Sequence, residues 1–361
     1  MVWQCAAIDH GVTVFPDGRI GPCCQIGPEY LKPVELIRDP NRFQDLKTET
    51  APHACRICVN NERSGISSYR AHFNQKVKGL PGVQFLDIRN TNLCNLKCRY
   101  CGPHFSNQWA MELKLENATV TTPVSDILDD IISDSLHWIY FTGGEPMINP
   151  DHWSLLKKLV DSGRSSRINL LYNTNLTTIK YKDIDVVDLW KNFYTVKINV
   201  SVDAVGDPLS YIRSGSDWER IRSNLDRVKA LNHVKLKLTP VISILNIWFL
   251  EELYAYAAEQ QLDLDAIILH GPDYLSLDVM PDQLKALASE IVDVIESYRL
   301  EPASKYQHMR DLINNNVNHG LFQHTLNHIL LLDQRRSERL FDLLPFGPVA
   351  QQMILENHEY Q

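Results

Sequence analysis

The pattern of apolar and polar residues changes near residue 83 of this chain. From there on, short runs rich in β-branched and aromatic residues alternate with longer stretches whose apolar residues recur at helical spacing. The strand-like runs are 83–88, 138–142, 167–172, 196–202, 235–242 and 266–269, and the helix-like stretches between them include 124–133, 153–161, 218–231 and 248–260. Strands that alternate with helices predict an α/β fold whose parallel sheet is rolled into a complete or partial (β/α)6 TIM-like barrel.

The segments on either side of this pattern have a different character. The first 78 residues hold short, turn-rich pieces such as Pro16-Asp17-Gly18. After residue 281 the helical periodicity runs through 283–298, 306–317 and 321–344. We therefore expect a small N-terminal domain at 1–78, the barrel at 79–275 and a helical C-terminal region at 276–361.

Composition places the chain among globular proteins. It has 361 residues, 44% of them hydrophobic, which suits one large domain or two unequal ones. No run approaches eighteen apolar residues, and the start lacks the basic and apolar regions of a signal peptide, so we expect a cytoplasmic protein without a membrane partner. The formal net charge of -8 argues against a broad nucleic-acid-binding face and favours small or peptidic substrates.

The cysteines carry the clearest chemistry. All eight lie in the first 101 residues, and this clustering in a long chain favours metal binding over disulfides. Cys94, Cys98 and Cys101 form a C-x3-C-x2-C run, which can hold three corners of a four-iron cluster and leave the fourth iron open. The alternatives are cysteines packed in a core or an incomplete zinc site, although zinc more often uses paired C-x2-C knuckles.

A second motif closes the predicted second strand. Gly143 and Gly144 would let a ligand approach the backbone closely, and exposed peptide groups together with the Glu145 carboxylate, before Pro146, could grip an ammonium group. The alternative interpretation is a tight turn between strand and helix.

Together these two motifs resemble the radical S-adenosylmethionine (radical SAM) superfamily. Its signature of C-x3-C-x-aromatic-C is matched by Cys94, Cys98, Tyr100 and Cys101, and its Gly-Gly-Glu-Pro motif is present unaltered. The resemblance implies a [4Fe-4S] cluster on the three cysteines, whose open iron chelates the amino and carboxylate groups of SAM. It further implies one-electron cleavage of SAM to methionine and a 5'-deoxyadenosyl radical, which abstracts a substrate hydrogen. An electron donor such as flavodoxin or ferredoxin would supply the electron.

The same resemblance suggests further SAM contacts, each with a structural alternative. Tyr100 would stack on a purine or fill the barrel mouth. Ser201, and less directly Asp203, would touch the ribose or simply end a strand. Arg213 would pair with the SAM carboxylate or lie exposed at a helix end. Asn173 would bind the cofactor or serve as a cap, and His270 would lie near the adenine.

The N-terminal cysteines resemble a different kind of site. Cys5, Cys23, Cys55 and Cys58 are similar to the ligand pattern of SPASM and twitch auxiliary domains, which hold an extra [4Fe-4S] cluster. Four cysteines that include a C-x2-C pair also suit zinc. Cys24 is left as the spare thiol, although it could exchange roles with Cys23. Such domains usually follow the barrel, so here the pattern implies a twitch-type domain that folds back over the barrel mouth.

These features predict a radical SAM oxidoreductase or maturase with two clusters, acting on a peptide or small metabolite. A second hypothesis is a redox-neutral radical epimerase in which Cys24 donates a hydrogen atom. A rival from another class is a zinc-dependent binding module in which both cysteine groups are structural. The histidines of the C-terminal region are predicted to be solvated or packed; they are His308, His319, His324 and His328.

Overall fold

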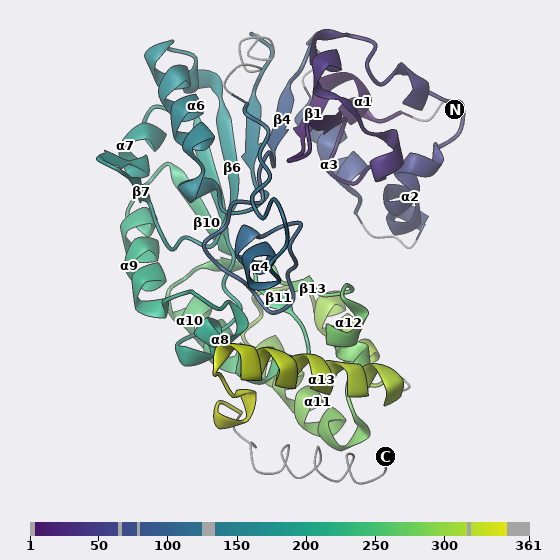
Figure 1. Cartoon of the computed structure of the whole chain (residues 1–361), viewed down its shortest axis with the longest axis vertical. Coiled ribbons are helices and arrows are strands. Elements are labelled where there is room, and N and C mark those ends of the chain that lie inside the picture. The colour runs from purple at the N-terminus through teal and green to yellow at the C-terminus, as the bar shows by residue number, and fades with distance from the viewer. Residues whose placement is uncertain (1–3, 64–66, 78–79, 125–133, 316–318, 345–361) are drawn as a thin grey trace.

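A large, mainly parallel sheet organises the chain (Figure 1). The computed structural model describes residues 4–63, 67–77, 80–124, 134–315 and 319–344. Six strands follow one another in the chain and lie side by side, all parallel; they are β4 (Phe85–Ile88), β5 (Trp138–Phe141), β6 (Asn169–Thr174), β9 (Thr195–Val200), β10 (Val234–Leu238) and β12 (Asp263–Leu264). The predicted α/β fold with a parallel sheet is confirmed, and the order of its strands is consistent with a partial TIM-like barrel.

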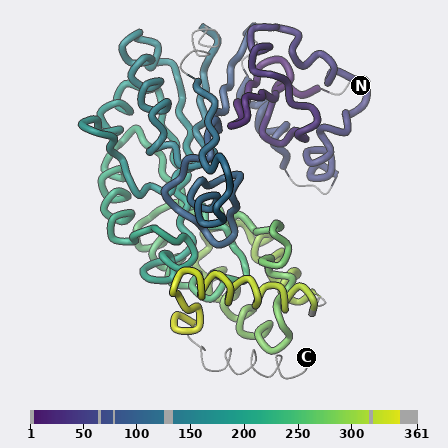
Figure 2. Tube along the Cα trace, viewed as in Figure 1, coloured from purple at the N-terminus to yellow at the C-terminus, as the bar shows by residue number. Residues whose placement is uncertain are grey.

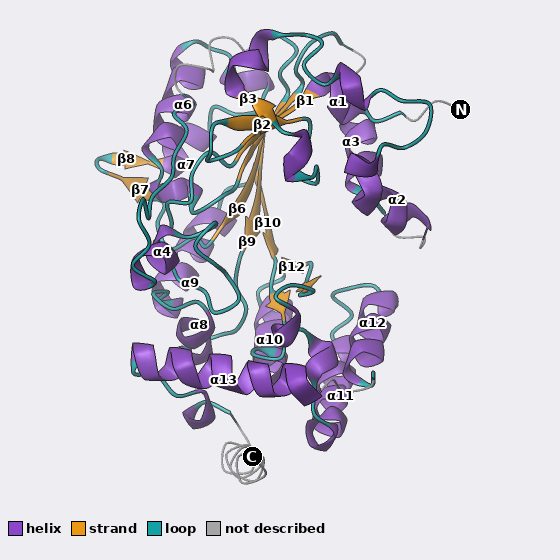
Figure 3. Ribbon diagram, turned by 45° about the vertical axis from the view of Figure 1, so that its right-hand side comes forward, coloured by secondary structure: helices purple, strands orange, loops and turns teal. Residues whose placement is uncertain are grey.

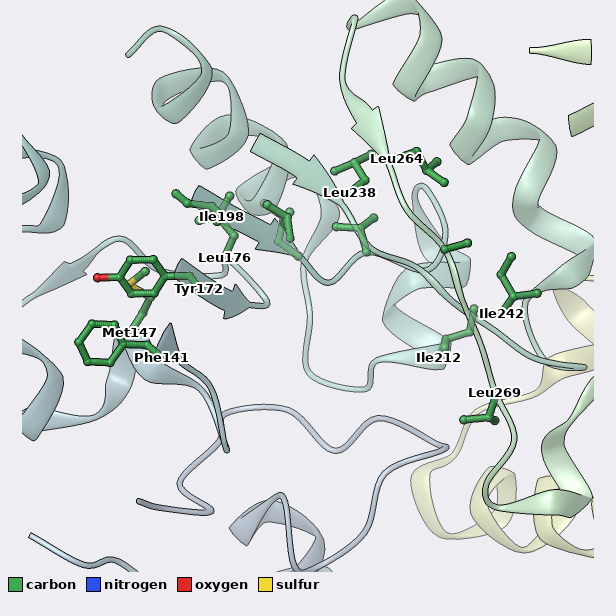
Figure 4. Close-up of a cluster of buried hydrophobic side chains, with 14 of the residues drawn as sticks. Phe141, Met147, Tyr172, Leu176, Ile198, Ile212, Leu238, Ile242, Leu264 and Leu269 are labelled. Atoms are coloured by element: carbon green, nitrogen blue, oxygen red, sulfur yellow. The ribbon is translucent and has the colours of Figure 1, made fainter. Parts of the chain in front are cut away.

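Helices cover one face of this sheet. They are α6 (Pro150–Asp161), α7 (Val186–Trp190), α9 (Trp218–Lys229) and α10 (Leu250–Glu259) (Figure 3). Caps fix where the longer ones begin: the Asn149 side chain accepts a hydrogen bond from the backbone of α6, and Asp217 does the same for α9. Beneath these helices lies the hydrophobic core, part of which is drawn in Figure 4.

The two faces of the sheet differ in burial. In β5, β6 and β9 every second residue is buried under the helices, and the residues between are only partly buried. We call the partly buried side the inner face; it carries Trp138, Tyr140, Asn169, Leu171, Asn173, Thr195, Lys197 and Asn199. An inner face that is polar and incompletely covered can receive a substrate.

The sheet departs from the predicted strands at its far edge. The run predicted as one strand at 235–242 divides into β10 and β11 (Val241–Ile242), because Pro240 between them has no N–H to donate. The run predicted at 266–269 forms β13 (Ile267–Ile268), which pairs with β11 in a separate two-stranded sheet. The prediction that 266–269 is the sixth strand of the large sheet is therefore wrong, since β12 takes that place. The helix predicted at 124–133 lies outside the described residues apart from Val124.

The N-terminal segment extends the sheet beyond β4. It contains α1 (Ala6–His10), β1 (Gly11–Val14), β2 (Arg19–Gly21), β3 (Lys32–Pro33), α2 (Arg56–Arg63) and α3 (Tyr69–Lys76). Strand β1 runs parallel to β4, with Val12 opposite Leu86, and β2 and β3 follow antiparallel. The segment thus shares a sheet with the barrel, and the domain boundary at residue 78 stays a prediction.

Three longer helices close the chain, α11 (Asp282–Ser297), α12 (Ala303–Ile313) and α13 (His319–Arg336), followed by the short η10 (Leu340–Asp342). Figure 2 shows α13 passing beside the loop that follows β4. These helices lie near the predicted stretches 283–298, 306–317 and 321–344, although α13 ends earlier, at Arg336. The boundary at residue 276 stays a prediction. None of the helices in the described ranges is long and apolar enough to cross a membrane.

Candidate functional site

The three barrel cysteines lie in the loop that follows β4, at the carboxyl end of the first parallel strand. Short α4 (Asn107–Glu112) shapes this loop: the Cys94 amide donates to Asn107 Oδ1 at 2.9 Å, and Trp109 Nε1 donates to the Cys98 carbonyl at 2.8 Å. The Leu96 amide donates to Cys94 Sγ at 3.4 Å. Hydrogen bonds of this kind to a sulfur stabilise a thiolate and tune a cluster bound to it.

The three thiols lie close enough for their charges to act on one another. Burial, together with the neighbouring Arg213, Cys101 and Asp203, sets the pKa of Cys98 at about 12, and burial also raises the pKa of Cys94 and Cys101. Within the described ranges, no three His, Cys, Asp or Glu side chains come close enough to share a single metal ion. A four-iron cluster carries its irons at separate corners, so its thiolates lie farther apart than ligands of one ion. Three thiols in this loop are suitable ligands for such a cluster.

A network of polar contacts joins Cys98 to three residues predicted to contact SAM, namely Arg213, Asp203 and Tyr100. Arg213 Nη1 lies 3.8 Å from Cys98 Sγ, and Arg213 Nε lies 2.7 Å from Asp203 Oδ2. The Tyr100 hydroxyl donates to the same Asp203 oxygen at 2.7 Å. Arg213 is thus a buried cation beside the Cys98 thiol and not an exposed arginine, and Asp203 holds it there. Tyr100 points its hydroxyl into this network.

The Gly-Gly-Glu-Pro motif lies directly against the cysteine loop. The Gly144 amide donates to the Thr91 carbonyl at 3.0 Å, and the Glu145 amide donates to the Leu93 carbonyl at 2.7 Å. A Cβ atom on Gly144 would lie 2.0 Å from the Leu93 oxygen, and Gly143 has a φ of +100°. Glycine is required here because the cysteine loop approaches the backbone closely. The motif alone had instead suggested the close approach of a bound ligand.

The Glu145 carboxylate is occupied by the protein itself. It is buried and accepts hydrogen bonds from the Met147 amide (3.0 Å), the Thr174 hydroxyl (2.6 Å) and the Asn175 amide (2.7 Å). Pro146, also buried, opens the short helix η5 (Pro146–Ile148). These bonds fix the end of β6 to the end of β5. They count against the predicted grip of Glu145 on an ammonium group, which stays untested.

The remaining predicted SAM contacts lie at different places. Ser201 is half-buried and directly follows β9 at the carboxyl edge of the sheet. Its backbone amide donates a hydrogen bond to the Thr174 carbonyl at 2.8 Å. Asn173 faces Asn199 across the inner face, with 2.8 Å between their amide groups. His270 is exposed and its ring lies 6.0 Å from that of His308.

In the N-terminal segment, Cys5, Cys23, Cys55 and Cys58 line one small cavity. Burial raises the pKa of Cys5 to about 11 and raises that of Cys23 as well. Four thiols around one cavity can close every iron of a cluster, whose ligands lie farther apart than those of a single metal ion, and the irons would have to displace the thiol protons. The structure therefore brings together the four residues that the sequence had grouped.

Cys24 faces elsewhere. It lines a second cavity, of about 590 Å³, between the N-terminal segment and the barrel loops. Phe15 and Leu31 border it on one side, and Arg89 and Gly143 on the other. Asp87 and Tyr69 adjoin the thiol, and burial raises its pKa to about 11. The exchange of roles between Cys23 and Cys24 that the sequence left open is disfavoured, because only Cys23 lines the four-cysteine cavity.

Residues of the C-terminal helix, which carry no motif, also bear on the site. Buried Arg99, which lies between Cys98 and Cys101 in the sequence, is 2.7 Å from Asp333 and 2.5 Å from Glu338. Arg336 donates to the Lys97 carbonyl at 3.0 Å. No signal in the sequence pointed to these contacts, because the residues that form them lie more than two hundred positions apart in the chain.

The C-terminal histidines have mixed surroundings. His324 stacks on Tyr274 with ring centroids 4.3 Å apart, and His328 Nε2 lies 3.3 Å from the Arg99 carbonyl. His328 is partly buried, whereas His324 and His308 are exposed, as expected for residues that are solvated or packed.

Residues 88–257 match the family model described as the radical SAM superfamily. The matched segment, from the end of β4 into α10, makes up just under half of the chain and includes the cysteine loop and the Gly-Gly-Glu-Pro turn.

Individual relatives are distant. An uncharacterized protein of Methanocaldococcus jannaschii is 27% identical over 56% of this chain and 65% of its own length. The 7-carboxy-7-deazaguanine synthase of Thermoplasma acidophilum is 32% identical over 27% of this chain and 39% of its own length. A solved structure, native anSMEcpe with bound AdoMet and a peptide, overlaps with a TM-score of 0.40 at 18% identity, over 59% of this chain and 60% of that one. The chain thus spans less than two thirds of these relatives.

Proposed function

We propose that this protein reductively cleaves SAM to methionine and a 5'-deoxyadenosyl radical and uses it to abstract hydrogen from a peptide or small-metabolite substrate. The observation that carries this proposal is the seating of the C-x3-C-x2-C loop on the Gly-Gly-Glu-Pro turn, through the Gly144 and Glu145 amides. When bound, a [4Fe-4S] cluster with SAM supplies the one-electron chemistry.

The chain's own residues hold and tune that site. Arg213 lowers the cost of a negative charge on the buried Cys98 sulfur, and Asp203 fixes the guanidinium in place with two contacts of 2.7 and 3.1 Å. Glu145 ties the ends of β5 and β6 together at the edge where the cysteine loop lies. A site held by buried hydrogen bonds on several strands is preorganised.

The N-terminal cysteines are proposed to bind a second [4Fe-4S] cluster, which transfers electrons or positions the substrate. Support comes from their convergence on one cavity in a segment that shares the sheet with the barrel. Flavodoxin or ferredoxin is the proposed electron donor.

Metal analysis of protein purified without oxygen tests both sites. We expect about eight irons with matching labile sulfide, about four after Cys94, Cys98 and Cys101 are all changed to Ala, and about four in a Cys23→Ala variant. Cys24→Ala is the matched control and should keep about eight. Stoichiometric zinc without labile sulfide would instead support the binding-module hypothesis.

A second candidate activity is redox-neutral epimerisation with Cys24 as hydrogen donor. It is favoured by the position of Cys24 in the cavity that Gly143 also lines, which is not the cavity lined by the other four N-terminal cysteines. In this step the S–H bond breaks homolytically and a C–H bond forms on the substrate radical. The resulting thiyl radical then takes one electron from a reduced iron-sulfur or flavin carrier and one proton from solvent.

Solvent deuterium distinguishes the two activities once a substrate is known. An epimerase would place one deuterium on carbon from D2O, and Cys24→Ala would abolish that product. Full product formation by Cys24→Ala would exclude the epimerase.

A further inference from the structure

A row of lysines crosses the inner face of the sheet. Lys197 on β9 lies opposite Lys235 on β10 in the parallel register, and Lys237 follows two residues along on the same face. Lys76, the last residue of α3, and Lys197 each place their ammonium group 5.1 Å from the centre of the Trp138 ring. We call Lys76, Lys197, Lys235 and Lys237 the lysine row.

The row lacks matching acidic groups. Lys237 lies 3.1 Å from Asp265, but Lys305 shares that carboxylate at 2.9 Å. Across the described ranges, no ion pair is found for Lys76, Lys197 or Lys235. Burial and the charges of Lys235 and Lys237 lower the pKa of Lys197, and burial and Lys197 lower that of Lys76. Like charges gathered in this way are destabilising unless an anion joins them.

Packing alone does not account for the row. The buried side of the same strands is filled by apolar residues such as Val196 and Ile198, as a core requires. On the inner face Lys197 and Lys237 are half-buried and Lys235 is exposed. Four lysines side by side are unusual in a chain with a net charge of -8. They lie on the inner face, away from α6, α7, α9 and α10 (Figure 3), and α3, which carries Lys76, packs on part of that face through Phe73 and Phe85.

We propose that the lysine row binds a phosphate or diphosphate group of the substrate. This inference rests on the proposed function and names its substrate class as a phosphorylated small molecule. Neighbouring strands lie about 4.8 Å apart, so Lys197 and Lys235 can both contact one phosphate. Ammonium groups suit phosphate as point charges, whereas a carboxylate is better matched by the planar fork of arginine, which the row lacks.

The position of the row fits the radical site. Lys197 precedes Ser201, at the carboxyl edge, by four residues, which corresponds to about 13 Å along an extended strand. A substrate anchored by its phosphate on the row can therefore place a carbon at the edge where the cysteine loop lies. Trp138, between two of the lysines, offers a ring surface for the body of such a molecule.

Calorimetric titration of the anaerobically purified full-length protein with inorganic pyrophosphate tests the inference. We expect saturable binding that weakens as NaCl is raised, and at least about a tenfold weaker affinity in Lys197→Gln/Lys235→Gln, because two charge-assisted contacts are lost. Lys197→Arg/Lys235→Arg should retain most of the affinity. The matched control is Lys157→Gln/Lys191→Gln, two exposed lysines paired with Asp161 and Asp188 outside the inner face.

Three results would overturn the inference. One is absence of pyrophosphate binding to a correctly folded protein. Another is equal affinity in Lys197→Gln/Lys235→Gln and the control, with both variants showing the wild-type unfolding temperature. The third is equally tight, equally lysine-dependent binding of citrate, which would assign the row to carboxylates. Because pyrophosphate binding requires neither cluster reduction nor SAM, its failure is distinct from a failure to cleave SAM.

Discussion

Arg99→Met removes a buried cation that ties the cysteine loop to the C-terminal helix. Arg99 is 1% exposed, and its guanidinium lies between Asp333 and Glu338 and 3.5 Å from the centre of the Tyr211 ring. The Arg99 Nε also donates to the Tyr211 carbonyl at 2.9 Å. Methionine keeps the apolar length of the side chain and deletes all of these polar contacts.

The expected loss of stability follows from what remains behind. Removing one partner of a buried pair costs roughly 3–5 kcal/mol, because the other charge is left uncompensated. Asp333 keeps hydrogen bonds from the Tyr211 hydroxyl (2.8 Å) and the Leu340 amide (2.9 Å), and Glu338 is partly solvated, so the lower end applies. With about 2.1 cal/mol/K per residue over 361 residues, the unfolding entropy is about 0.76 kcal/mol/K, and 3 kcal/mol corresponds to about 4 °C.

Thermal unfolding followed by circular dichroism under nitrogen measures this shift. Arg222→Met is the control, because Arg222 pairs with Glu219 on the exposed surface of α9 and such a pair contributes less than about 1 kcal/mol. A second variant, Arg99→Met/Asp333→Leu, removes the stranded carboxylate and should recover part of the loss. An unfolding temperature of Arg99→Met within 1 °C of the control would refute the reasoning.

Two further predictions concern single residues of the barrel. Gly144→Ala should lose about four irons, because its Cβ would lie 2.0 Å from the Leu93 oxygen. The control Gly102→Ala, whose Cβ would have no atom within 4 Å, should keep its iron. Equal iron content in the two variants would contradict this prediction. Burial lowers the pKa of His152 from 6.5 to about 3. As the pH drops below 6.5, the unfolded chain therefore binds a proton that the folded chain does not, and the free energy of unfolding falls by about 2 kcal/mol at pH 5. His152→Phe should flatten this part of the profile in urea unfolding at pH 7 and pH 5, and an unchanged slope would show that another group titrates.

The alternation of apolar and polar residues predicted the central strands well, because only one face of each of these strands is fully buried. The runs predicted at 138–142 and 196–202 fall within two residues of β5 and β9, whose alternate residues are buried. The prediction failed where backbone chemistry overrides side-chain pattern. Pro240 divides an apolar run that reads as one strand, and β1 joins the sheet through a pairing that no local pattern in the first 78 residues reveals.

The site was predictable only as far as its motifs extend. The cysteine triplet, the two glycines and the four N-terminal cysteines could be picked out because they form motifs in the sequence, and the structure gives the glycines a packing role that the motif alone did not reveal. The buried contact of Arg213 with Asp203 and the internal bonds of Glu145 depend on the folded positions of separate strands. The lysine row was missed for the same reason, since its members come from one helix and two strands and meet only on the inner face.

The formation of 5'-deoxyadenosine from SAM by the reduced protein tests the central claim most directly. The wild-type chain, with its iron content verified, should yield 5'-deoxyadenosine and methionine when treated with a strong reductant. The Cys94, Cys98 and Cys101 triple Ala variant should yield neither. Absence of 5'-deoxyadenosine from wild-type protein that holds its full complement of about eight irons would contradict the account.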